Sequence, residues 1–64
     1  MELTIPLDVL RAAVAGLLVE DGIADPMAAG RTAKDDWRQP YMQKYICQAA
    51  GVMLTLHAHN MLST

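Results

Sequence analysis

Residues 21–26, Asp21-Gly22-Ile23-Ala24-Asp25-Pro26, set the course of the chain because they end one helix and begin another. Gly22 can take the left-handed backbone conformation that closes a helix, and Ile23 follows it as in a Schellman arrangement. Asp25 and Pro26 then supply an N-cap and a first-turn proline, which together are typical of a helix start. We therefore expect two helices that meet at this short turn.

Before the turn, apolar residues recur at the spacing of one helix face, namely Leu7, Leu10, Val14, Leu17 and Leu18. Pro6 suits the start of this helix because its missing N–H would be unpaired there, and Asp8 suits the positive end of the helix dipole. The pattern predicts a helix over residues 6–20.

After the turn, the pattern predicts helices over residues 26–38 and 40–60, with Pro40 between them. A proline inside a helix removes one backbone hydrogen bond and clashes with the carbonyl four residues earlier, that of Asp36. Either the helix breaks at Gln39-Pro40, or it continues through Pro40 with a kink. Because Gln39 is a poor N-cap, we favour a kinked or closely abutting pair of helices over a true loop.

No segment alternates with period two, so we expect an all-α protein of two to three helices in a single domain, residues 1–64. For 64 residues, apolar burial contributes about 90 kcal/mol and ordering the chain costs about 95 kcal/mol, so one copy is marginal. Cys47 is the only cysteine and cannot form an internal disulfide. Oligomerisation is the remaining way to stabilise so small a chain.

Two segments, residues 9–19 and 45–64, are too apolar for a helix that faces water on one side. Arg11 is the only charged residue in the first, and the second contains no Asp, Glu, Lys or Arg. We expect a helical hairpin that pairs with a second copy to form a four-helix-like bundle. The predicted dimer interface comprises Leu10, Val14, Leu17, Ile46, Ala49, Met53 and Leu56.

The sequence favours neither a metal site nor a cofactor site, and it does not favour an enzyme. His57 and His59 point about 200° apart on a helix and cannot share one ion within a chain. Cys47 has only Lys44 as a cationic neighbour one turn away, with no loop to stabilise an oxyanion. Polar residues interrupt the uncharged C-terminal stretch, so we expect it to be buried core and not a membrane span.

The segment 34–45 contains the only Trp, both Tyr and three of the five cations, and Trp, Tyr and Arg are the residues most enriched at binding hot spots. If the helix passes through Pro40, the three aromatic residues fall four residues apart on one face. Trp37 can instead close the end of the bundle. The predicted partner-binding residues are Lys34, Trp37, Arg38, Tyr41, Lys44 and Tyr45.

We therefore expect a non-catalytic homodimer that binds a larger protein with an acidic surface and regulates or inhibits it. In size and build the chain is similar to the compact accessory and inhibitor proteins of bacteria and phages. The alternative is a helix-turn-helix-like DNA-binding regulator with its cations on the second helix, although the turn acids and the net charge of −2 oppose phosphate binding. The lone cysteine and an N-terminus without a cationic leader region predict a cytoplasmic protein.

Overall fold

The computed structural model describes residues 5–59, which form three helices and no strand. The helices are α1 (Leu7–Glu20), α2 (Ala29–Asp35) and α3 (Met42–Ala58). The all-α prediction is confirmed. The predicted end of the first helix, residue 20, is the observed one, and the other predicted ends differ from the observed ones by one to three residues. Residue 60, the last of the predicted third helix, lies outside the described part of the chain.

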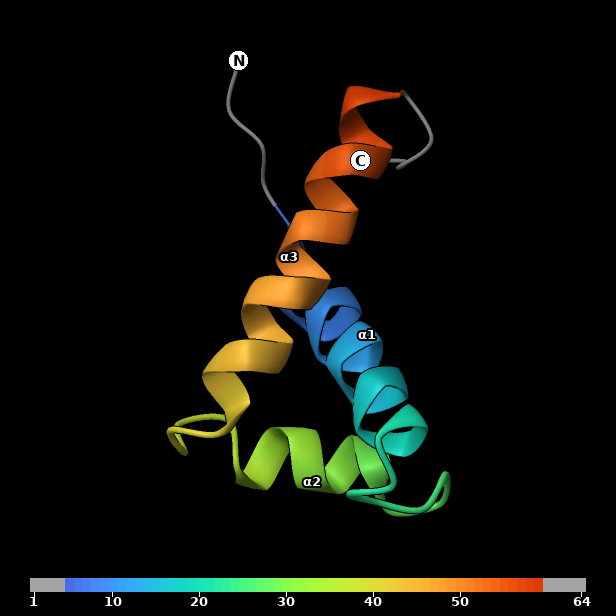
Figure 1. The fold of residues 1–64 in the computed structure, drawn as a ribbon, viewed down its shortest axis with the longest axis vertical. Coiled ribbons are helices and arrows are strands. Elements are labelled where there is room, and N and C mark those ends of the chain that lie inside the picture. Colours follow the sequence, from blue (N-terminus) through green and yellow to red (C-terminus); the bar gives the residue numbers. More distant parts are fainter. Residues whose placement is uncertain (1–4, 60–64) are drawn as a thin grey trace.

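The helices do not form the simple hairpin that we expected. Figure 1 shows α1 and α3 crossing, with α2 lying across the end of the molecule below them. Helix α1 packs against both other helices and is the central element of the fold. A short α2 joined by turns at both ends makes this arrangement possible, because each turn changes the direction of the chain.

The turn between α1 and α2 has the hydrogen bonds of a Schellman motif. The Ile23 N–H donates to the Leu18 carbonyl at 2.9 Å, and the Gly22 N–H donates to the Val19 carbonyl at 3.0 Å. Gly22 has a φ of 74°, the left-handed conformation that the sequence predicts. The first helix therefore ends where expected, for the expected reason.

The prediction of Asp25 as the N-cap of a helix that starts at Pro26 is wrong, because α2 begins at Ala29 with Ala28 as its N-cap. Asp25 instead caps the turn that precedes α2. Its Oδ1 accepts hydrogen bonds from the backbone N–H groups of Met27 at 2.9 Å and Ala28 at 3.0 Å. Its carbonyl accepts the first helical bond, from the Ala29 N–H at 2.9 Å. Residues 26–28 form a turn that leads directly into α2.

The expectation of a kinked helix through Pro40 is wrong, because residues 36–41 form a series of turns between α2 and α3. Pro40 has no N–H for the Asp36 carbonyl, which instead accepts a hydrogen bond from the Gln39 N–H at 2.9 Å. The Gln39 carbonyl in turn accepts from the Met42 N–H at 3.0 Å. Both carbonyls are satisfied locally, so α2 can end and α3 can start in a new direction.

The core forms where the three helices meet. Its buried members are Val14, Leu18, Ala33, Met42, Tyr45 and Ala49. Leu18 and Met42 are the largest fully buried side chains, and both alanines lie at positions where a small side chain brings two helices close together. Half-buried residues around this cluster include Trp37 and Ile46.

The same substitution is expected to have opposite effects at two glycines. A Cβ at Gly51, inside α3, would meet no atom within 4 Å. We therefore expect Gly51→Ala to raise the free energy of unfolding by about 1 kcal/mol through helix propensity. Gly22→Ala is expected to lower it by about 1 kcal/mol, because its φ of 74° is unfavourable for a residue with a Cβ.

Urea denaturation of both variants, at one protein concentration, measures these effects. A loss of stability in Gly51→Ala would mean that another surface packs closely against this part of α3.

Candidate functional site

The structure divides the predicted partner-binding segment 34–45 between the surface and the core. Tyr45 is only 5% exposed and belongs to the core cluster. Trp37 is half-buried against that cluster, whereas Lys34, Arg38, Tyr41 and Lys44 are exposed. Because the chain turns between Trp37 and Tyr41, the three aromatic side chains do not form the continuous helix face that a kinked helix would give.

Tyr45 and Lys44 both contact Asp21, at the end of α1. The Tyr45 hydroxyl donates a hydrogen bond of 2.7 Å to Asp21 Oδ2, and Lys44 Nζ lies 3.9 Å from the same oxygen. Lys44 Nζ also lies 5.3 Å from the centre of the Tyr45 ring. These contacts join α3 to the end of α1. They therefore give Tyr45 and Lys44 a structural role that needs no binding partner.

Tyr41 forms a hydrogen bond within the turn that contains it, residues 36–41. Its hydroxyl donates a hydrogen bond of 2.5 Å to Asp36 Oδ2, which holds the turn between α2 and α3 together. This bond to a carboxylate raises the pKa of Tyr41 to about 12, with a smaller contribution from burial. The bond to Asp21 likewise raises the pKa of Tyr45.

These two tyrosines predict a loss of stability at alkaline pH. Each phenol has a higher pKa in the folded chain than its ordinary value of 10.0, so the folded state holds the proton more tightly. Their contribution is complete below pH 10 and is lost as the pH rises from about 10 towards 12.

Urea midpoints at several values between about pH 8 and pH 11.5 measure this loss. Tyr41→Phe and Tyr45→Phe are each expected to make the midpoint less dependent on pH in that window. An unchanged pH dependence in both variants would contradict the assignment, and absorbance at 295 nm follows the phenolates directly.

The predicted dimer-interface residues lie largely inside the single chain. Val14, Ala49 and Met53 are buried there, so other atoms of the same chain already cover them. The other four are half-buried, namely Leu10, Leu17, Ile46 and Leu56. The large apolar side chains of α3 that remain open are Val52, 56% exposed, and Leu54, 52% exposed, and only Leu54 lies towards the side opposite the core.

A set of exposed side chains along α2 and its flanking turns was only partly predicted from the sequence. We call it the basic face, and it comprises Met27, Arg31, Lys34 and Arg38. The first three are spaced four and three residues apart, as on one side of a helix. Met27 is 96% exposed. The helical spacing of Met27, Arg31 and Lys34 in the sequence could have indicated this face. The prediction gave more weight to the aromatic residues and therefore placed the site at residues 34–45.

The cations of this face are unpaired within the described chain. Among residues 5–59, the only Lys or Arg nitrogen within 4.0 Å of a carboxylate oxygen is that of Lys44. Arg31 and Arg38 therefore do not pair with Asp35, which lies between them in the sequence. The charges of Arg31, Lys34 and Arg38 are therefore exposed and not neutralised by a carboxylate of the described chain.

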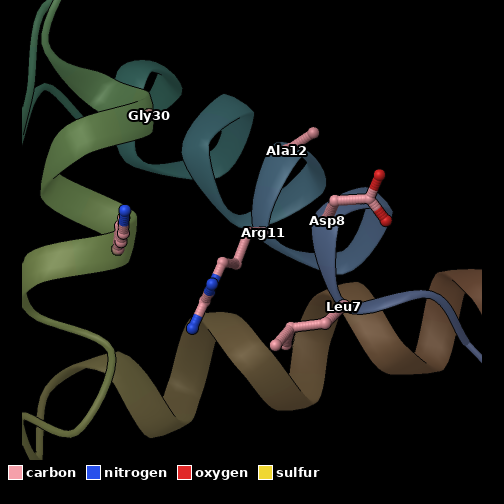
Figure 2. A pocket seen from close by; sticks show the side chains of 6 residues that line it. Leu7, Asp8, Arg11, Ala12 and Gly30 are labelled. Carbon is pink, nitrogen blue, oxygen red and sulfur yellow. The ribbon is translucent and has the colours of Figure 1, made fainter.

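A groove of about 510 Å³ lies between α1 and α2, beside Lys34 (Figure 2). Its lining residues are Leu7, Asp8, Arg11, Ala12, Gly30 and Lys34. Arg11 is half-buried, and its guanidinium carbon lies 5.2 Å from the centre of the Trp37 ring. The groove therefore combines two cations and one carboxylate with apolar and small residues.

The described residues contain no cluster of side chains suited to a metal ion. No group of three or more His, Cys, Asp or Glu side chains in residues 5–59 could hold a metal ion. Cys47 is a free, exposed thiol. His59 Nδ1 contacts the Thr55 carbonyl at 2.9 Å near the end of α3. None of the helices in this range has the length and hydropathy to cross a bilayer.

The chain matches no protein-family model, no curated protein and no solved structure. The features of the molecule that bear on its function are therefore the basic face, the groove and the exposed apolar surface.

Proposed function

We propose that this protein is a non-catalytic, homodimeric helical module that binds the acidic surface of a larger protein and regulates or inhibits that protein by occupying it. The observation that carries the proposal is the basic face, where Arg31, Lys34 and Arg38 are exposed and have no carboxylate partner in the described chain. Arg is enriched at binding hot spots because it combines a long apolar stem with a directed charge. Met27 beside them supplies an adaptable apolar contact.

A capture experiment tests the basic face. The full chain is immobilised and incubated with host lysate, and the captured protein is then identified by mass spectrometry and purified. Its affinity for the wild-type chain and for the variants is measured by titration. We expect Arg31→Ala combined with Arg38→Ala to weaken binding at least tenfold, about 1.4 kcal/mol.

Lys44→Ala is the matched control, because Lys44 is also exposed but already lies beside Asp21. Its affinity is expected to stay within about twofold of wild type, as is usual for peripheral contacts. A loss in Lys44→Ala as large as that in the double variant would indicate a general charge effect. No loss in the double variant would place the partner elsewhere on the molecule.

Self-association is the second part of the proposal, and it uses the outer side of α3. The residues there are Cys47, Gly51, Leu54 and Ala58, which are all exposed and uncharged. A face of this kind usually faces another apolar surface. A second copy of the chain can supply that surface without any additional gene product.

Sedimentation equilibrium tests the dimer. Leu54→Lys is expected to convert it to a folded monomer, whereas Gln48→Lys adds the same charge away from Leu54 and is expected to leave it intact. A wild-type chain that stays monomeric and folded at micromolar concentration would contradict the dimer.

DNA binding stays the alternative, because the cations of α2 follow a helix and a short turn. The exposed turn acids oppose it, since Glu20 and Asp25 would approach the phosphates together with the cations. A gel-shift titration at low salt distinguishes the two functions. Tight duplex binding that weakens steeply with salt would favour the regulator over the protein-binding module.

A further inference from the structure

We propose that the groove between α1 and α2 is an anchor site for one acidic side chain of the protein partner, with an apolar side chain next to it in the partner sequence. This inference rests on the proposed function, and it names the chemistry of the segment that the partner presents. Arg11 and Lys34 would bind the carboxylate, and Leu7 would contact the apolar neighbour.

The size of the groove fits such a ligand. Its volume of about 510 Å³ lies within the range of small-ligand sites and is ample for one or two side chains. Gly30 leaves the α2 wall open, because a Cβ at this position would meet no atom within 4 Å. Ala12 on the α1 wall is also small. The space is therefore a consequence of two small residues that face it.

Arg11 is already held in place before any ligand arrives. Its guanidinium lies 5.2 Å from the Trp37 ring centre, close enough for a cation–π contact. Its Nε is covered and has no hydrogen-bond partner in the described chain. A covered, unpaired N–H is unfavourable, so an incoming carboxylate can gain free energy by satisfying the guanidinium after a small rotation. Because packing holds the side chain, less conformational entropy is lost on binding.

The charges in the groove favour an anion. Arg11 and Lys34 line it together, and neither lies within 4.0 Å of a carboxylate oxygen among residues 5–59. Asp8 is the one acid in the lining, and Figure 2 shows its carboxylate pointing away from the Arg11 guanidinium. The groove therefore holds one more positive than negative charge, and the negative charge is turned away from the anchor.

The apolar wall favours a protein carboxylate over a free anion or a nucleic-acid phosphate. Leu7 is 49% exposed at the groove, where a hydrated phosphate would leave it uncovered. An acidic residue beside a leucine or a similar residue would satisfy the guanidinium and cover Leu7 at once. Lys34 belongs to both the groove and the basic face, so a partner on the basic face can reach the groove without crossing the molecule.

The test is an NMR titration of the full, nitrogen-15-labelled chain. The probes are the capped peptides acetyl-Leu-Asp-Leu-amide and acetyl-Leu-Asn-Leu-amide, inorganic phosphate and a short DNA duplex. The Nε–H signal of Arg11 and the amide signal of Gly30 report on the groove. We expect the Asp peptide to shift both signals saturably, with at least tenfold weaker binding of the Asn peptide.

Two variants locate the binding. Arg11→Gln is expected to abolish it, and Lys34→Ala, which alters only an exposed side chain, is expected to weaken it at least threefold. Lys44→Ala is the control and should bind as the wild type does. Equal shifts with the Asn peptide, unchanged binding in Lys34→Ala, or tighter binding of phosphate or DNA at the same signals would each overturn the inference.

The captured partner separates this inference from the proposed function. If Arg31→Ala with Arg38→Ala weakens capture but Arg11→Gln and Lys34→Ala do not, the proposed function holds and the anchor site is wrong. If Arg11→Gln and Lys34→Ala weaken capture but Arg31→Ala with Arg38→Ala does not, the anchor site holds and the basic face is wrong as the carrier of the proposed function.

Discussion

Leu18→Ala is expected to lower the free energy of unfolding by about 3 kcal/mol. Leu18 is fully buried at the centre of the core, where α1 faces both other helices. Truncation removes apolar contacts and leaves a cavity that the backbone can fill only partly. A single core in a chain this short supplies roughly 3–5 kcal/mol, so the variant keeps at most about 2 kcal/mol and up to about half of it is unfolded at 25 °C.

Urea denaturation followed by circular dichroism measures this loss. Leu54→Ala is the matched control, because it removes the same atoms from a side chain that is 52% exposed. We expect its effect to stay below about 1 kcal/mol at a protein concentration where the chain is monomeric. Similar losses in the two variants would contradict the position of the core between the helices.

Ala33→Leu is expected to cost about 2–3 kcal/mol for the opposite reason, which is overpacking. Ala33 is fully buried on α2 and belongs to the core cluster with Val14 and Leu18 of α1. A leucine there has no space unless α2 moves away from α1. Because α2 has only seven residues, few other contacts would hold it in place after such a movement.

Ala12→Leu is the control for this substitution, since Ala12 is exposed on α1 and lines the open groove. Its stability is expected to stay within about 0.5 kcal/mol of wild type. It should also partly fill the groove and so weaken the Asp-peptide binding described above. A stable Ala33→Leu variant would mean that α2 does not pack on α1 as closely as the structure places it.

The end of α1 and the turn that precedes α2 could be predicted from residues 21–26 because they depend on local chemistry, whereas α2 itself starts three residues later than predicted, at Ala29. Gly22 closes a helix through its own φ, and Asp25 caps the next turn through hydrogen bonds to residues two and three positions away. Interactions of such short range are visible in the sequence.

The connection at Pro40 could be predicted only as two alternatives. Proline makes a regular helix costly at this point, but both a kink and a break avoid that cost. The break depends on where α3 finds its contacts, namely Met42 and Tyr45 in the core beside α1. The preference for a kinked or closely abutting pair was wrong because it rested on Gln39 as a poor N-cap, whereas α3 begins after Tyr41 without any side-chain cap.

The candidate site shows the same division. Its charges could be predicted, since Lys34 and Arg38 are exposed cations as expected. The groove could not be predicted from the sequence. Arg11 and Lys34 are 23 positions apart and line one space only after α2 has folded against α1.

Local sequence patterns are enough to predict that this chain is helical, where its first turn lies, and which segment carries the cations. Periodicity, capping and charge act over a few residues and therefore leave a local pattern. The packing of the helices places Tyr45 in the core and Arg11 over Trp37, and it opens a groove between α1 and α2. These features depend on how three helices pack, and packing depends on contacts between residues far apart in the chain.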